Sequence, residues 1–210
     1  MIFRIAKPSD LNRIVDIHYS TRSVNGYGIF AQMGKPFLKA YYKIVLSNKY
    51  SVFVCAEDDN GNVQGVAFAI LNSEQFDTEV KQNKFRLAVG ALSSIIVKPA
   101  LLLSLFSRYR SLQKEDNKFV NNYGARGGFW GWNPDNKDSI SSYELHERFL
   151  AIIHDLGVKE LHFEVDKENK AVYRFHKING AKEIEILKLP DGRERVMMSY
   201  DMDTHVSRVF

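Results

Sequence analysis

Cysteine is almost absent from this sequence, since Cys55 is the single one among 210 residues. An internal disulfide is therefore excluded. Cys55 lies in the apolar run 51–56, which is typical of a buried strand. We interpret its thiol as a small packed side chain and not as a nucleophile.

The sequence also lacks an unbroken hydrophobic run long enough to cross a membrane. Its most apolar stretch is 85–106, and Lys98-Pro99 divides it into two pieces. Each piece is well below the ~20 residues of a spanning helix. Two buried helices are the simpler interpretation, and a surface helix near lipid, with Arg108 and Arg110 as a basic flank, is the alternative.

Neither sign of charge dominates: 29 Lys and Arg face 25 Asp and Glu, a net charge of +4. This mild excess does not indicate a nucleic-acid-binding protein. The first residues lack the apolar core and cleavage site of a signal peptide, so we expect a cytoplasmic protein. Without a repeat, a linker or a low-complexity tract, residues 1–210 are predicted to form one α/β domain.

Hydrophobic periodicity predicts a mostly antiparallel, mixed central sheet flanked by helices, with a helical insertion around 75–110. Ser9 is the expected N-cap of the first helix, and Asn60-Gly61 predicts a hairpin. A charged segment, 111–120, is expected to be an exposed loop. The expected strands are 2–6, 50–57, 63–71, 129–132, 160–165, 182–187 and 195–201, and the expected helices are 11–18, 35–46, 142–156 and 170–178.

Two polar turns in the second half of the chain each follow a strand and precede a helix. The first turn runs from Trp132-Asn133-Pro134 to Ser142, and the second contains Asn169. This order places a helix N-terminus beside a strand end, which is an arrangement that binds anions.

In this order of elements the whole chain resembles the GNAT superfamily of acyl-CoA-dependent N-acyltransferases. Within it, the segment Met33–Tyr42 and the apolar insertion resemble acetyltransferase-like proteins associated with surface-polysaccharide biosynthesis. The resemblance implies a GNAT fold and transfer of an acetyl or other acyl group from acetyl-CoA or another acyl-CoA. The implied acceptor is an amine of a small molecule, such as an amino-sugar.

The family's cofactor turn has the pattern Arg/Gln-x-x-Gly-x-Gly/Ala, whose backbone N–H groups hold a diphosphate. Lys137 matches the first position, whereas Ile140 and Ser142 stand where glycines are expected. The resemblance implies that Lys137 and the hydroxyls of this turn bind the cofactor, and that N–H groups of the preceding strand polarise the thioester carbonyl. The implied cofactor-binding residues are Gly131, Trp132, Lys137, Asp138, Ser139, Ser141, Ser142 and Asn169.

The family's general acid is a tyrosine, and His176 stands at its position. A histidinium could protonate the leaving thiolate at neutral pH, so we predict His176 as the catalytic residue. The alternative is a surface histidine near a helix C-terminus. Glu57 and Glu144 are both candidates for the general base, and the sequence does not choose between them.

Other chemistry finds less support. His146 and His154 share a helix face but stand roughly 12 Å apart, too far for one metal ion, so no metal is expected. The aromatic cluster 123–132 would suit a sugar, an adenine or single-stranded nucleic acid, but its acidic neighbours argue against nucleic acid. The missing glycines favour a second function, a GNAT-fold binding or scaffolding domain without catalysis.

Overall fold

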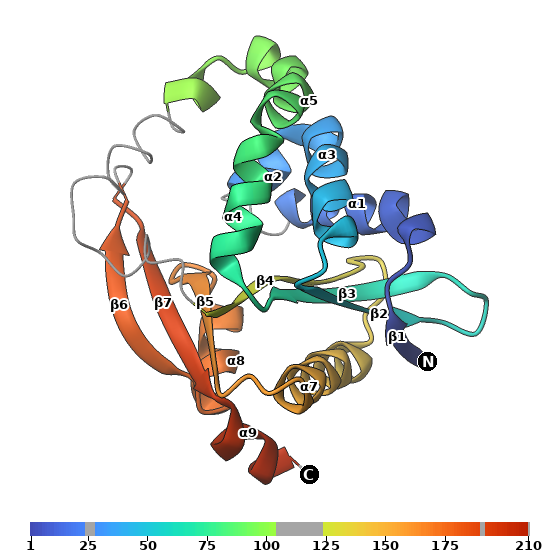
Figure 1. The fold of residues 1–210 in the computed structure, drawn as a ribbon, viewed down its shortest axis with the longest axis vertical. Coiled ribbons are helices and arrows are strands. Elements are labelled where there is room, and N and C mark those ends of the chain that lie inside the picture. Colours follow the sequence, from blue (N-terminus) through green and yellow to red (C-terminus); the bar gives the residue numbers. More distant parts are fainter. Residues whose placement is uncertain (24–27, 104–123, 190–191, 210) are drawn as a thin grey trace.

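The structure is a computed structural model that describes residues 1–23, 28–103, 124–189 and 192–209. Its described strands form one seven-stranded sheet in the order β1-β2-β3-β4-β5-β7-β6 (Figure 1). Every neighbouring pair is antiparallel except β4 and β5, which are parallel. The strands are β1 (Ile2–Ile5), β2 (Ser51–Glu57), β3 (Val63–Ile70), β4 (Ala125–Trp132), β5 (Glu160–Asp166), β6 (Lys182–Lys188) and β7 (Glu194–Asp201).

Helices cover both faces of this sheet (Figure 1). The helices α1 (Leu11–Ser20), α3 (Gly34–Ser47), α4 (Ser73–Gln82) and α5 (Lys84–Val97) cover one face, and α7 (Ser139–Asp155) and α8 (Lys170–Ile178) cover the other. Two shorter helices are α2 (Ile29–Gln32) and the C-terminal α9 (Met202–Val209), and 3-10 turns span Pro8–Asp10 and Thr21–Ser23.

Alternation along β2 and β3 divides the core into two layers. Val52 and Val54 of β2 pack with the residues of α7, whereas Phe53 and Cys55 pack with α1 and α3. Successive side chains of a strand point to opposite faces, so strands buried on both sides are apolar throughout. Cys55 is fully buried, and burial raises the pKa of its thiol to about 11, which confirms the packing role.

The parallel pair in the centre of the sheet is very short. β4 and β5 pair at Ala125 with Leu161 and at Arg126 with His162, both at the start of the strands. Beyond these pairs the strands diverge, leaving Gly127–Trp132 and Phe163–Asp166 unpaired with each other; we call this region the β4–β5 gap.

The predicted fold is confirmed, with changes at the ends of elements. The hairpin forms at Asn60-Gly61, where Gly61 has a φ of +79° and the Asp58 carboxylate accepts the N–H groups of Asn60 and Asn62. Ser9 is not the cap of the first helix, because it lies inside a 3-10 turn and Asp10 precedes α1. Helix α7 begins three residues before the predicted start, and α2 and α9 were not predicted.

The predicted insertion consists of α4 and α5 in the described part of the chain. The expected loop 111–120 and the basic flank Arg108 and Arg110 lie outside the described residues. Across the described ranges, no helix combines the length and apolar character that a bilayer crossing requires.

Candidate functional site

The predicted site residues gather at the carboxyl-terminal ends of the central strands β4 and β5, around the β4–β5 gap. Because β4 and β5 are parallel, the turns that follow them lie at the same edge. The turn after β4 carries Lys137 and leads into α7, and the turn after β5 carries Asn169 and leads into α8. Trp130 on β4 contacts Phe175 and His176 on α8, with ring centroids 4.9 and 6.0 Å apart. The two turns therefore flank one site.

The N-terminus of α7 already holds an anion of the chain itself. The Asp138 carboxylate accepts the Ser141 N–H at 2.9 Å, and the Ser142 N–H donates to the Asp138 carbonyl at 3.3 Å. The Ser139 N–H donates to the Lys137 carbonyl at 3.0 Å. A hydrogen bond from the Ser141 hydroxyl lowers the pKa of Asp138 further, so the carboxylate is charged at neutral pH. A diphosphate at this helix end would meet engaged amides and a negative charge.

Side chains of the same turn are accessible. Lys137, Ser139 and Ile140 are exposed, and Ser142 is half-buried. Ile140 therefore does not close the turn, although it stands where a glycine was expected. A cation and hydroxyls remain available for an anion outside the cap.

The backbone of β4 presents alternate N–H groups to the gap. Asn133 donates to the Gln64 carbonyl at 2.7 Å, so its polar groups point toward β3. Polar groups alternate sides along a strand, so those of Gly131 also point toward β3 and those of Trp132 point toward the gap. Trp132, rather than Gly131, therefore offers an amide to a ligand there.

His176 is buried and neutral. Its Nδ1 lies 2.9 Å from the Tyr200 hydroxyl, and burial lowers its pKa to about 3. It is neither the histidinium proposed from the sequence nor a surface residue. Burial also raises the pKa of Tyr200. Asn169 begins α8, but its side chain makes no capping hydrogen bond there.

Aromatic rings of β4, α7 and α8 pack together on one face of the sheet beside the gap. The Trp130 ring lies 4.7 Å from that of His146 on α7, and His146 lies 5.3 Å from His176. The indole N–H groups of Trp130 and Trp132 are buried without a hydrogen-bond partner in the described structure. Buried donors of this kind are normally paired, so they fit an acceptor supplied by a ligand or water.

A histidine–carboxylate cluster beneath these rings was missed by the sequence analysis. On α7, His146 Nδ1 lies 3.2 Å from Glu147 Oε1, and His205 of α9 places Nε2 2.8 Å from Glu147 Oε2. Burial opposes the charge of Glu147, but the hydrogen bonds from the two histidines outweigh it and lower its pKa to about 2. Burial lowers the pKa of His146.

The oxygen atoms that face the two histidines indicate which ring nitrogens carry hydrogen. Glu147 is ionised, so His146 donates through Nδ1 and keeps a lone pair on Nε2. The Nδ1 of His205 faces the Asn179 carbonyl at 3.0 Å, so both of its nitrogens face acceptors. A histidine held by a carboxylate is an arrangement that prepares a general base.

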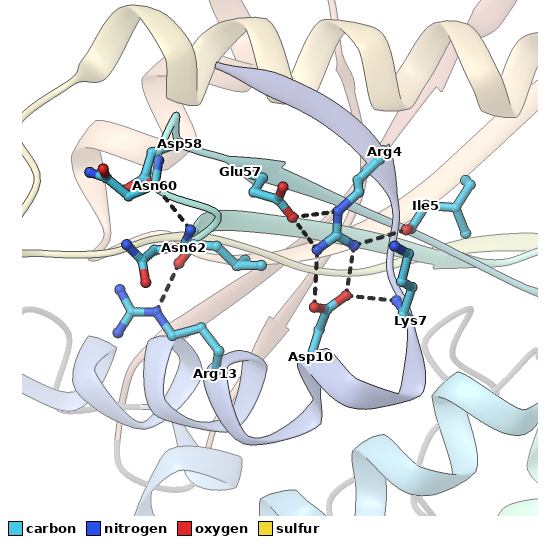
Figure 2. A network of polar contacts seen from close by, with 10 residues as sticks. Arg4, Ile5, Lys7, Asp10, Arg13, Glu57, Asp58, Asn60 and Asn62 are labelled. Carbon is cyan, nitrogen blue, oxygen red and sulfur yellow. Dashed lines mark hydrogen bonds and ion pairs between the residues drawn. The ribbon is translucent and has the colours of Figure 1, made fainter.

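The two carboxylates suggested as bases are both held in ion pairs. Glu57 accepts from Arg4 Nε at 2.7 Å, and the same guanidinium binds Asp10 at 2.8 Å (Figure 2). This network joins β1, β2 and the 3-10 turn, away from the gap. Glu144 is paired with Arg148 one helical turn later, at 2.6 Å.

A hollow of about 150 Å³ lies beside the cluster and not at the gap. It is lined by Asn179, Gly180, Lys182, Asp201, Thr204 and His205, none of which was predicted as a site residue. Within the described residues, no group of three or more His, Cys, Asp or Glu is arranged to hold a metal ion.

Comparison with known proteins gives likeness of fold. The sequence matches no protein-family model, and no curated protein is similar to it at a significant level. The structure is similar to the ribosomal-protein-alanine N-acetyltransferase of Brucella melitensis, with a TM-score of 0.62, 13% identity and coverage of 96% of this chain and 99% of that one. It is also similar to a mutant of the spermidine N-acetyltransferase SpeG of Vibrio cholerae, with a TM-score of 0.58, 13% identity and coverage of 100% and 98%. The chain therefore has the fold of GNAT N-acetyltransferases.

Proposed function

We propose that this protein transfers an acyl group from acyl-CoA, with acetyl-CoA as the first candidate, to the amine of a small molecule. The observation that carries the proposal is the β4–β5 gap, toward which the Trp132 amide points, together with the buried and unpaired indole N–H groups of Trp130 and Trp132. The similar structures are named as N-acetyltransferases of spermidine and of a ribosomal-protein alanine. An amine acceptor agrees with those names, whereas neither names an amino-sugar.

The residues of the gap fit the thioester arm of the cofactor better than its diphosphate. Acyl-CoA would supply an activated carbonyl, and the Trp132 N–H and the indole donors are suited to its acceptor atoms. The diphosphate end would be held by Lys137, Ser139 and Ser142 outside the Asp138 cap. Ser141, whose N–H is bound to Asp138, would contribute through its hydroxyl. Asn169 would contact the arm of the cofactor from the other side of the gap.

His146 is the proposed general base. Glu147 fixes its tautomer and leaves Nε2 free to accept the proton of the attacking amine. The new C–N bond forms as the C–S bond breaks, His146 takes the proton of the amine, and the leaving thiolate takes up a proton from water. In this proposal the Tyr200 hydroxyl donates to His176 Nδ1, so that His176 Nε2–H hydrogen-bonds the leaving sulfur.

The proposal is tested by calorimetry with acetyl-CoA, followed by an assay of thiol release with a panel of small amines. We expect saturable binding below millimolar concentration and turnover that falls by about 10²–10⁴ in His146→Gln. Glu144→Gln, on the same helix, is the matched control and should retain activity. Absence of binding at millimolar acetyl-CoA would exclude the acyltransferase.

A second function, binding without transfer, is favoured by the Asp138 cap and by the neutral His176. A domain that binds acyl-CoA or another ligand at the gap, but does not turn it over, would keep the fold and lose the anion site. Saturable binding of acetyl-CoA without thiol release for any amine would support it. Turnover that His176→Phe abolishes while binding persists would exclude it.

The cap itself yields a prediction. In Asp138→Asn the carboxylate charge is lost, but asparagine caps helices as well as aspartate. We expect affinity for acetyl-CoA to rise about fivefold, because the charge that competes with the diphosphate for the N-terminus of α7 is removed. Calorimetry measures the change, and Asp135→Asn, an exposed carboxylate in the same turn, is the control. Equal affinities in the two variants would place the diphosphate away from this helix.

A further inference from the structure

Helix α5 packs inward through Leu87, Gly90, Ala91 and Ile95, and it also carries large apolar side chains on its outward face. Gly90 is so close to α3 that a Cβ there would lie 3.0 Å from the Phe37 Cα and the Pro36 carbonyl oxygen. Ala91, one residue later, is buried. On the opposite side of the helix, Phe85 is 80% exposed and Ile96 is 71% exposed. An ordinary surface helix has an apolar stripe against the core and a polar face toward solvent, whereas the outward face of α5 is apolar as well.

The exposed residues form one continuous stripe. Phe85, Val89, Leu92 and Ile96 follow each other at intervals of four, three and four residues, which places them along one face of the helix. Each of them is more than half exposed. Val97, the last residue of the helix, and Leu102 and Leu103 beyond it are exposed apolar side chains as well. We call Phe85, Val89, Leu92, Ile96, Val97, Leu102 and Leu103 the α5 stripe. Proteins without a partner rarely expose an apolar patch of this kind.

Positive charges border the stripe. Residues 80–103 contain Lys81, Lys84, Arg86 and Lys98 and no Asp or Glu. Lys84 and Arg86 flank Phe85 in the sequence, and both are exposed. Helix α3, against which α5 packs, also contains lysines and no acidic residue. The acidic residues nearest in the sequence, Asp77 and Glu79, belong to α4 and are half-buried.

The apolar stripe and its basic border together indicate what kind of surface α5 binds. From the stripe and its flanking charges we infer that α5 docks on the surface of a membrane containing anionic phospholipid. An apolar helix face bordered by Lys and Arg is the pattern of helices that lie in the interface of anionic bilayers. A second copy of the chain would bring two basic borders together, and like charges oppose that pairing.

The position of α5 suits such docking. It lies at one end of the long axis of the molecule, whereas α7 and α9 lie toward the other end (Figure 1). A membrane at the α5 end would leave the edge of the sheet with the β4–β5 gap in water. The inference does not depend on the acyl-transfer proposal, because none of the gap residues belongs to the α5 stripe.

Sedimentation of the full chain with lipid vesicles tests the inference. We expect binding to vesicles of phosphatidylcholine with phosphatidylglycerol, little binding to phosphatidylcholine alone, and weakening by salt. The double variant Phe85→Ser/Ile96→Ser should bind at least tenfold more weakly. The triple variant Lys84→Gln/Arg86→Gln/Lys98→Gln should lose about a hundredfold, since each basic residue near such a surface contributes about a factor of five.

Matched variants on other faces separate this site from a general effect. Leu156→Ser/Ile178→Ser removes two exposed apolar side chains, and Lys170→Gln/Arg174→Gln/Lys188→Gln removes three exposed cations. Both should bind vesicles within about a factor of two to three of the parent, because none of these residues borders the α5 stripe.

Four results would overturn the inference. Equal binding to both vesicle types would show that anionic lipid is not recognised. Absence of binding to both types would show that α5 does not dock on lipid. A parent that is dimeric in sedimentation velocity, with a monomeric stripe variant, would assign the stripe to a second copy. A large loss of thermal stability in Phe85→Ser/Ile96→Ser would mean that the chain itself covers the stripe.

Discussion

At the scale of single residues, burial sets the chemistry that identity alone leaves open. His176 and His18 are both buried, and each places Nδ1 against a buried tyrosine hydroxyl, at 2.9 Å for Tyr200 and 2.6 Å for Tyr42. Burial lowers the pKa of His176 to about 3 and that of His18 to about 4. The sequence could place His176 at the general-acid position, but it could not show that the imidazole would be neutral. Proton donation to a thiolate is therefore not the role that its surroundings favour.

These buried imidazoles predict how stability depends on pH. On unfolding, His176 returns from a pKa of about 3 to about 6.5, so between these values the unfolded chain binds more protons. The free energy of unfolding should fall as pH decreases from 6.5. Urea unfolding between pH 4.5 and 7.5 should show a slope shallower in His176→Phe by up to about 1.4 kcal/mol per pH unit. Tyr200→Phe keeps the imidazole, so it should lower stability without flattening the slope.

At the scale of elements, the apolar patterns predict the strands well and the orientation of α5 poorly. Strands β2 and β3 are apolar on both faces, and a buried strand is the simplest arrangement for such runs. Helix α5 is apolar on both faces as well, so periodicity could not show which face meets α3. The size of the side chains indicates which face of α5 meets α3, because Gly90 and Ala91 permit close contact between helices. The early start of α7 has a local cause, the capping hydrogen bond of Asp138.

Close packing at Gly90 predicts a size limit. A side chain at Gly90 meets backbone atoms of α3, which cannot rotate away, so Gly90→Val should lower the free energy of unfolding by about 1–3 kcal/mol. Ser93→Val places the same side chain on an exposed part of the helix and should change stability little. Chemical denaturation of the two variants measures the difference. Equal stabilities would show that α5 does not rest on α3 at this position.

At the scale of the whole molecule, the site depends on contacts between residues far apart in the chain. His205 bonds Glu147 across 58 residues and joins α9 to α7. The sequence placed His146 and Glu147 on one helix, but nothing local showed that His205 would meet them. This cluster was missed because it exists only in the folded chain. The succession of strand, polar turn and helix at each side of the site could be predicted, since each turn directly follows a strand in the sequence.

Loss of one partner should expose the cost of the buried charge. His205→Ala leaves the Glu147 carboxylate buried with a weaker set of donors, and we expect a loss of about 3–5 kcal/mol in the free energy of unfolding. His205→Ala/Glu147→Gln removes the charge as well and should be less destabilised than the sum of the two single changes. Urea unfolding of the four proteins gives the coupling energy. Additive losses would show that the two side chains do not interact.

The short pairing between β4 and β5, of only two residue pairs, should affect the rates at which backbone amides of β4 exchange with deuterated water. Amides of Gly131 and Asn133 point toward β3 and should be retained for long times, whereas those of Trp130 and Trp132 should be replaced sooner. One strand would then carry fast and slow positions in turn, resolvable by nuclear magnetic resonance. A compound that fills the opening should slow the fast positions and leave the others unchanged, which makes β4 a built-in reporter of occupancy.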